Sequence, residues 1–376
     1  MSPARFSPLT ADCVCNADYA SHHLRTRHVI YARITSFTHA SRRGAIYRAQ
    51  FSGKPIIVIE KKWDVLALGV TAVDDLLYVA AFPAADEKTK VLASARQCGG
   101  LSATALVAAS RLGACCAYAG ALGENELSEY VESTLVREGI DVNFVVRRED
   151  ASPVHSTIIV DNATGTRNIF SESIGFCGAD ETAPEAEIIA AARVLFVDHY
   201  GLEGTLRAAK IAHENAIPIV ADIERHASLP FSQLTGGELM DLVDHLIVSR
   251  DFALRTTGRS TPAAAARALW SLHRKVVIVT CGENGCWVLA ARDAELRHFP
   301  AFQVKAVDTT GCGDVFHGAY AGALSQGWDL ENCLRFASAA AAMKARQRGG
   351  QKGIPTREEL EIFLETFASQ SSVCEP

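Results

Sequence analysis

One stretch decides the fold: Val307-Asp308-Thr309-Thr310-Gly311-Cys312-Gly313-Asp314, followed by Val315-Phe316-His317-Gly318-Ala319-Tyr320. Glycines at 311 and 313 lack a Cβ, so the backbone can turn tightly and approach a ligand. The apolar residues after Asp314 predict a helix, whose dipole favours an anion at the amides of Gly311, Cys312 and Gly313. Asp314 would stand beside that anion and accept a proton from a hydroxyl group. The stretch therefore predicts a site of phosphoryl transfer.

A glycine turn before a helix is often only a helix cap, but the whole string from Asp308 to Asp314 is far more specific. It resembles the second signature of the PfkB, or ribokinase-like, carbohydrate kinases, which usually have Ala where Cys312 stands. The resemblance implies a doubly wound, mainly parallel α/β sheet with helices on both faces and a small β-sheet lid. It also implies that Asp314 is the base and that ATP donates its γ-phosphoryl group to a sugar hydroxyl.

Composition limits the alternatives. A chain of 376 residues with 48% hydrophobic residues can bury a large core, and a net charge of -6 gives no basic surface for nucleic acid. No apolar run approaches the roughly 20 residues that span a bilayer, so we expect a soluble, cytoplasmic protein. The eleven cysteines show no Cys-x-x-Cys spacing for zinc. Most of them are expected to be small core residues. A side hypothesis for Cys312, at a helix N-terminus, is a lowered pKa and openness to oxidation.

The chain divides into three parts. Residues 1–62 are rich in Ser, Arg and His and poor in acids, which predicts a non-globular or targeting-like extension. Organellar targeting stays open but is not favoured, because no amphipathic helix is evident. Residues 63–368 form the predicted kinase domain, and 369–376 a C-terminal tail. Within the domain, strands alternate with helices as in a doubly wound sheet, and residues 76–96 and 156–172 are expected to form the β lid. We expect a homodimer through this lid.

The sugar end is predicted from residues that follow early strands. Gly99 and Gly100 precede a helix and resemble the first family signature, although Thr104 replaces its usual Asn. Asp74 follows the first strand, at the edge where ligands of open α/β sheets bind, and its carboxylate suits vicinal hydroxyls. Arg167 in the lid would suit an anionic substrate, unless it is a solvated strand-edge residue.

The nucleotide end is predicted from the resemblance. Thr280, Gly282 and Gly285 match the family's Thr-x-Gly-x-x-Gly turn, which lies against ATP. Thr310, Gly311, Gly313 and Ala340 complete the predicted ATP site. Asp308 and Thr310 would supply part of a site for a monovalent cation such as K⁺.

One departure concerns magnesium. Many family members carry Asn-x-x-Glu, which organises Mg²⁺, where this chain has Ser249-Arg250-Asp251-Phe252. Asp251 or Glu224 could partly compensate. Mg²⁺ would still be required, because it neutralises charge on the transferring phosphates. Two alternatives therefore stay open: a nucleoside kinase of the same fold, and a catalytically silent nucleotide- or sugar-binding member.

Overall fold

The computed structural model describes residues 40–371, with gaps at 42–43, 52–53, 165, 225–237 and 272. In this part of the chain the central sheet comprises β4 (Trp63–Leu68), β7 (Cys116–Tyr118), β12 (Ala192–Asp198), β13 (Ile219–Asp222), β14 (His245–Ser249), β15 (Val276–Thr280), β16 (Cys286–Leu289) and β17 (Arg297–Phe299). Their order is β17-β16-β15-β14-β13-β12-β4-β7. Six neighbouring strands of this sheet run parallel: β7, β4, β12, β13, β14 and β15. At one edge β16 pairs antiparallel with β15, and β17 pairs antiparallel with β16.

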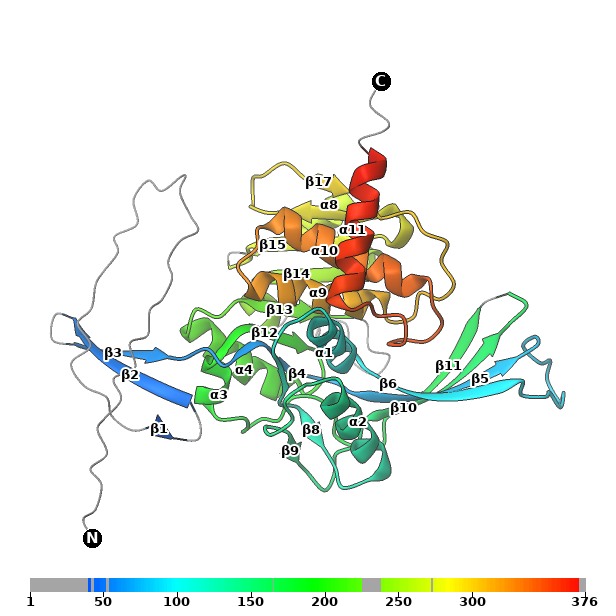
Figure 1. Ribbon diagram of the computed structural model, residues 1–376, viewed down its shortest axis with the longest axis horizontal. Helices are drawn as coiled ribbons and strands as arrows, with labels where there is room; N and C mark the ends of the chain where they lie inside the picture. The colour runs from blue at the N-terminus through cyan, green and yellow to red at the C-terminus, as the bar shows by residue number, and fades with distance from the viewer. Residues whose placement is uncertain are drawn as a thin grey trace, which may run out of the picture. The chain divides into compact units, whose positions relative to one another are not determined.

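Helices cover both faces of this sheet (Figure 1). One face carries α1 (Leu101–Arg111), α2 (Glu126–Arg137), α9 (Cys312–Ser325), α10 (Leu330–Ala345) and α11 (Arg357–Ser371). The other carries α3 (Ala186–Ala190), α4 (Leu202–Glu214), α6 (Glu238–Leu242), α7 (Arg250–Thr257) and α8 (Pro262–Ala268). The predicted doubly wound, mainly parallel fold is thereby confirmed.

The two hydrophobic cores follow from the alternation of side chains along each strand. Val65 and Ala67 of β4 lie in the core beneath α1 and α9, whereas Leu66 and Leu68 lie in the opposite core. Successive side chains of a strand point to opposite faces, so a strand covered on both sides is apolar throughout. The continuous apolar runs in the sequence are explained by this double coverage.

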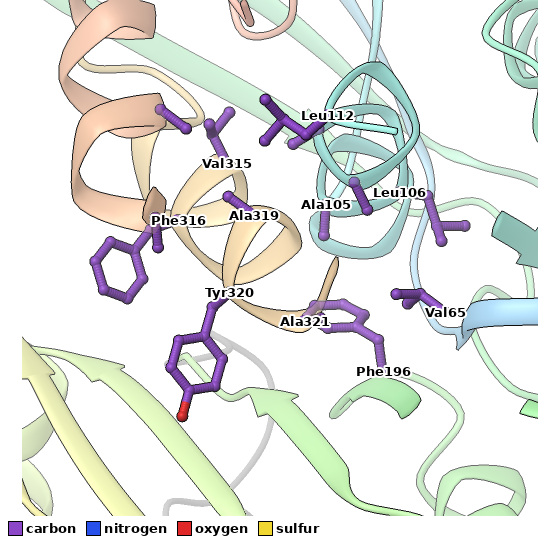
Figure 2. Packing of buried hydrophobic residues seen from close by; sticks show 14 of the residues in the cluster. Val65, Ala105, Leu106, Leu112, Phe196, Val315, Phe316, Ala319, Tyr320 and Ala321 are labelled. Atoms are coloured by element: carbon purple, nitrogen blue, oxygen red, sulfur yellow. The ribbon is translucent and has the colours of Figure 1, made fainter. Parts of the chain in front are cut away.

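Helix α9 is held by close packing against α1. Gly318 faces α1 so closely that a Cβ there would overlap the carbonyl oxygen of Ala105. Figure 2 shows Ala319 of α9 turned toward Ala105 of α1, with Tyr320 pointing away toward the strands. The Tyr320 hydroxyl lies 2.8 Å from Nδ1 of His245 on β14. Such packing fixes the position of the N-terminus of α9.

A second, smaller sheet has the order β11-β10-β5-β6. It consists of β5 (Ala72–Val79), β6 (Ala93–Gly99), β10 (Val154–Asp161) and β11 (Arg167–Glu172). Strands β5 and β10 run parallel, and the two outer strands pair antiparallel with them. The expected small β-sheet is confirmed. Two further short strands, β8 (Ala121–Leu122) and β9 (Val146–Arg147), pair parallel with each other.

The region before residue 60 differs from the sequence prediction where it is described. Strands β1 (Ala40–Ser41), β2 (Gly44–Phe51) and β3 (Lys54–Ile59) form a three-stranded sheet, although no regular structure is predicted there. The β-branched run from Ile56 to Ile59 favours strand structure and is the signal that the prediction missed. Residues 1–39, and with them most of the predicted extension, lie outside the described residues, as do residues 372–376 of the predicted tail. No helix in the described part is long and apolar enough to cross a membrane.

Candidate active site

The glycine-rich stretch forms the turn that leads into α9. Gly311 is the N-cap residue with a φ of 75°, and a Cβ there would lie 2.9 Å from the carbonyl oxygen of Gly350. The amide of Cys312 donates to the carbonyl oxygen of Thr309 at 3.2 Å, so it serves the turn itself. The amides of Gly311 and Gly313 have no acceptor among the described residues, and a Cβ on Gly313 would meet nothing within 4 Å. Two of the three predicted amides are thus left for an anion.

Asp314 lies in the first turn of α9 and is surrounded by other carboxylates. Burial raises the pKa of Asp314 well above its usual value. The negative charges of Asp222, Glu224 and Asp74 raise it further, whereas His317 opposes them. A carboxylate with a raised pKa is a better general base near neutral pH. The predicted base, Asp314, is thus near enough to Asp74, the carboxylate predicted to bind the sugar, for the charge of Asp74 to affect its pKa.

Asp222 and His317 are not among the sequence predictions. Asp222 ends β13, and its Oδ2 lies 3.2 Å from Nδ1 of His317. The same ring places Nδ1 2.8 Å from the carbonyl oxygen of Gly313 and Nε2 3.0 Å from that of Ile247. Burial and the charge of Glu224 raise the pKa of Asp222, and burial lowers the pKa of His317. Asp222 could have been found from the sequence, because it ends an apolar strand at the ligand-binding edge of the sheet.

Asp74 lies within β5, between two polar neighbours on adjacent strands. Ser156 of β10 and Gln97 of β6 both stand opposite Asp74 in the strand register. Burial raises the pKa of Asp74, and the neighbouring polar side chains of Ser156 and Gln97 act in the opposite direction. A Cβ on Gly99 would lie 2.6 Å from Oδ2 of Asp74, so only glycine leaves room for this carboxylate. The predicted residues Asp74 and Gly99 are therefore in contact.

Gly100 and Thr104 have structural partners. Gly100 has a φ of 92°, and a Cβ there would lie 2.6 Å from Cα of Thr71. Thr104 is buried, and its Oγ1 accepts a hydrogen bond of 3.2 Å from Nε2 of Gln351. The hydroxyl of Thr104 is thus engaged inside the protein, whereas the sequence predicts a substrate contact for it.

The predicted nucleotide turn lies at the carboxyl edge of the central sheet. Thr280 ends β15 and donates to the carbonyl oxygen of Val248 at 3.3 Å. Gly282 has a φ of 59°, and a Cβ there would meet nothing within 4 Å. Gly285 has a φ of 77°, and a Cβ there would overlap the carbonyl oxygen of Phe299. Ala340, in contrast, is 0% exposed within the core, so its side chain is not available to a nucleotide.

Asp308 is a carboxylate with its hydrogen bonds satisfied. Its Oδ1 accepts from the amide of Thr310 and its Oδ2 from the amide of Gly349, both at 2.8 Å. The ammonium group of Lys344 donates to the carbonyl oxygen of Asp308 at 2.9 Å. Burial opposes ionisation, but the bonds from Thr310 and Gly349 and the charge of Lys344 hold the pKa of Asp308 below its usual value.

A cavity of ≈ 70 Å³ lies where the small sheet meets this turn. Nη1 of Arg167 on β11 lies 4.0 Å from Oδ1 of Asp308, so the lid arginine does face the site. Arg348 stacks over the ring of Tyr78, 5.5 Å from its centroid. The cavity is lined on the lid side by Tyr78, Asn162 and Arg167, and on the other side by Asp308, Thr310 and Arg348.

The lowered pKa that the side hypothesis assigns to Cys312 is not found. Burial raises the pKa of its thiol to about 11, which outweighs the effect of the helix N-terminus. The thiol donates a long hydrogen bond of 3.6 Å to the carbonyl oxygen of Ala341 on α10. Cys312 is therefore a small packing residue beside the anion site.

The structure does not bring Asp251 to this cluster. It lies exposed at the start of α7, with Oδ1 3.3 Å from Nε of the neighbouring Arg250. The carboxylates that act on Asp314 are Asp222 and Glu224 instead. No group of three or more His, Cys, Asp or Glu side chains placed to hold a metal ion occurs in the described ranges.

Comparison with known proteins identifies the family. The sequence profile of the pfkB family carbohydrate kinases matches residues 64–357. The chain belongs to this family. Ribokinase from Haemophilus influenzae is 30% identical over 282 residues, which cover 71% of this chain and 87% of that protein. The structure of ribokinase from Thermotoga maritima has a TM-score of 0.69 at 28% identity and covers 80% of this chain and 99% of its own. Ribokinase from Arabidopsis thaliana, complexed with ribose and ATP, has the same fold, with a TM-score of 0.70 at 22% identity, covering 80% of this chain and 98% of its own.

Proposed function

We propose that this carbohydrate kinase transfers the γ-phosphoryl group of ATP to a hydroxyl group of a sugar or related small polyol, with Asp314 as the base. The observation that carries the proposal is the position of Asp314 in the first turn of α9. There it adjoins the amides of Gly311 and Gly313 and lies in the field of Asp74. In this proposal the base Asp314, the anion site and the sugar-binding carboxylate Asp74 act together at the N-terminus of α9.

The roles follow from the environments of these groups. Asp74 accepts hydrogen bonds from the substrate and orients the reacting hydroxyl group, because its carboxylate lies between Ser156 and Gln97 on the small sheet. Asp314 takes the proton from that hydroxyl as it attacks. The amides of Gly311 and Gly313, aligned with the dipole of α9, hold the transferring phosphoryl group.

The remaining contacts are assigned by position. The turn from Thr280 to Gly285 is proposed to lie against ATP, since it ends a parallel strand of the central sheet at the carboxyl edge. Arg167 is proposed to contact the substrate or its transferred group from the lid, where it faces the Asp308 turn.

Burial raises the pKa of Asp222, Glu224 and Asp314, and the charges of neighbouring carboxylates raise it further for Asp222 and Asp314. A divalent cation beside these acidic side chains would offset that repulsion. We propose that Asp222 and Glu224, rather than Asp251, face the Mg²⁺ that accompanies ATP. When bound, Mg²⁺ neutralises charge on the transferring phosphates. Few protein ligands are needed, because this ion keeps several waters and binds the phosphates as well.

Turnover of ATP across a panel of sugars and nucleosides tests the proposal. We expect turnover with at least one sugar; a nucleoside preference would establish the nucleoside kinase, and nucleotide binding without any turnover would establish the silent member. Asp314→Asn should lower kcat by about a thousandfold while ATP affinity changes little, because only proton transfer is removed. Asp251→Asn is the matched control: it removes an exposed carboxylate and should leave kcat unchanged. Near wild-type turnover in Asp314→Asn would remove Asp314 from its role.

We also propose that the small sheet pairs with a second copy of the chain. Strand β11 is an edge strand exposed along its whole length, and it carries Ile169 and Phe170, which are 54% and 58% exposed. Exposed apolar residues on an edge strand favour association. Light scattering should show a dimer, and Phe170→Lys should shift it toward the monomer.

A further inference from the structure

Lys344 is an unusual residue in this site because its side chain is completely buried. It lies in the last turn of α10 and is 0% exposed, among the largest fully buried side chains of the described residues. Lysine is almost never fully buried unless its charge is compensated, since removing an ammonium group from water is unfavourable. A buried lysine beside a candidate active site therefore needs an explanation.

The contacts of Lys344 lead directly to the anion site. Its ammonium group donates to the carbonyl oxygen of Asp308 at 2.9 Å. The carbonyl oxygen of Ala345, the next residue of α10, accepts a hydrogen bond of 3.1 Å from the amide of Asp308. Burial lowers the pKa of the amine, and the charges of Asp308 and Asp314 oppose this shift and favour the protonated form. The end of α10 thus holds both backbone polar groups of Asp308, and the chain turns from there into Gly311, the N-cap of α9.

These residues do not fit a monovalent cation. Such an ion needs several oxygen ligands, and the family resemblance suggests Asp308 and Thr310 as part of that set. Here the carbonyl oxygen of Asp308 is occupied by an ammonium group, and its carboxylate oxygens accept from the amides of Thr310 and Gly349. Arg167 adds a second positive charge 4.0 Å from Oδ1 of Asp308. A further cation would be repelled by both side chains.

We propose that the ammonium group of Lys344 is a built-in cation at this turn, so that the enzyme works without K⁺ or another monovalent ion. Lys344 acts as a positioning residue: it fixes the Asp308 turn, and through it the amides of Gly311 and Gly313, and it adds a positive charge behind the anion site. The inference rests on the proposed phosphoryl transfer for its kinetic consequence, but the occupancy of the site by Lys344 does not depend on the substrate.

Kinetics with and without K⁺ test the proposal first. Wild-type turnover, measured in a tetramethylammonium buffer, should change by less than about twofold when about 100 mM KCl is added, because no site is open to mass action by the ion. Strong activation of the wild type by K⁺ would overturn the proposal.

Variants at Lys344 sharpen the test. Lys344→Ala should lower kcat by about a hundredfold with little change in KM, since a preorganised charge acts mainly on the transition state. Added K⁺ or methylammonium should restore part of this loss, because truncation opens the site. Lys344→Met, which fills the same space without charge, should lose kcat and should not be rescued. Lys352→Met is the matched control, because it removes an exposed lysine from the adjacent loop and should behave as wild type. A Lys344→Ala protein with reduced kcat and no response to either cation would show that Lys344 only fills space.

A binding measurement separates this proposal from the proposed function. K⁺ should raise the Tm of Lys344→Ala but not that of the wild type or of Lys344→Met, since only the truncated protein has a site for the ion. This arm can be read even if no sugar is turned over, in which case the proposed function fails while the inference on Lys344 stands. If Lys344→Ala does not fold, the K⁺ response of the wild type and the loss of kcat in Lys344→Met still decide it. An equal rise in Tm in wild type and variant would overturn it.

Discussion

Asp308 and Asp314 flank the same glycine turn, yet their surroundings are opposite. Asp308 accepts two backbone amides and lies next to Lys344, and its pKa is held below the usual value. Burial of Asp314, together with the negative charges of Asp222 and Glu224, raises its pKa well above the usual value. The first carboxylate is compensated by the protein, whereas the second is not.

The two environments suggest different roles for the two carboxylates of this short stretch. A carboxylate whose negative charge is satisfied within the fold stabilises that fold and has little left to offer a ligand. A carboxylate held among other carboxylates destabilises the empty protein, and this repulsion is relieved by a proton, a metal ion or a substrate. Perturbation in opposite directions therefore supports the proposal that Asp308 belongs to the scaffold and that Asp314 is the reacting group.

The largest expected effect on stability comes from removing the charge of Asp308, the carboxylate that the protein compensates. Asp308→Asn should lower the free energy of unfolding by about 2 kcal/mol, because the amide side chain of Asn cannot accept from both backbone amides and no longer offsets the buried charge of Lys344. Asp314→Asn should leave this free energy unchanged or raise it by about 1 kcal/mol, because repulsion in the cluster falls. Urea unfolding monitored by tryptophan fluorescence measures both.

The effects of Asp308→Asn and Asp314→Asn on the free energy of unfolding should change with pH in opposite directions. The lowered pKa of Asp308 means that its stabilisation is present above the pKa of the unfolded chain and is lost as pH falls through the folded value, so Asp308→Asn should be least harmful in acid. Asp314 has a raised pKa, and its stabilisation is present at low pH and lost as pH rises through the folded value. The gain from Asp314→Asn should therefore appear as pH rises through the folded pKa of Asp314 and vanish below the pKa of the unfolded chain. The same sign for both variants would refute the division into scaffold and reacting group.

A smaller effect concerns the acidic cluster itself. Asp222→Asn removes one negative charge that raises the pKa of Asp314, so ionised Asp314 should persist to lower pH. The acid limb of the kcat profile should move to lower pH by about one unit, even if kcat at its plateau also falls. An unmoved acid limb would mean that a group other than Asp314 controls it. Asp251→Asn again serves as the control, since that residue lies outside the cluster.

Much of the fold could be predicted because its signals are local and periodic. The strand ending in Asp198 and the strand from Val276 to Thr280 are apolar runs, and the helix after Gly311 follows from its glycine cap. The sequence predicts a last helix over residues 331–346, which corresponds to α10, and does not predict α11. The sequence predicts one strand over residues 115–122, whereas the structure has β7 and β8 there, in two different sheets.

In the candidate site, too, features with a local sequence signal could be predicted, and features that depend on distant contacts could not. Asp314, Gly311 and Asp74 could be found from sequence, since motif and strand-end position point to them without knowledge of distant neighbours. The environment of Lys344 could not be predicted, because it depends on a contact between the end of α10 and a turn 36 residues earlier in the chain. The burial of Cys312 against α10 could not be predicted for the same reason.

The smallest expected effect tests whether Thr104 belongs to the scaffold or to the substrate site. Thr104→Val keeps the shape of the side chain but leaves Nε2 of Gln351 without its acceptor, so the free energy of unfolding should fall by about 1 kcal/mol. The KM for the acceptor should change by less than about twofold, because the hydroxyl of Thr104 already has a partner inside the protein. Gly99→Ala is the contrasting variant: its Cβ would lie 2.6 Å from Oδ2 of Asp74, so it should displace that carboxylate and raise KM strongly. A large rise in KM for Thr104→Val would instead place Thr104 in contact with the substrate.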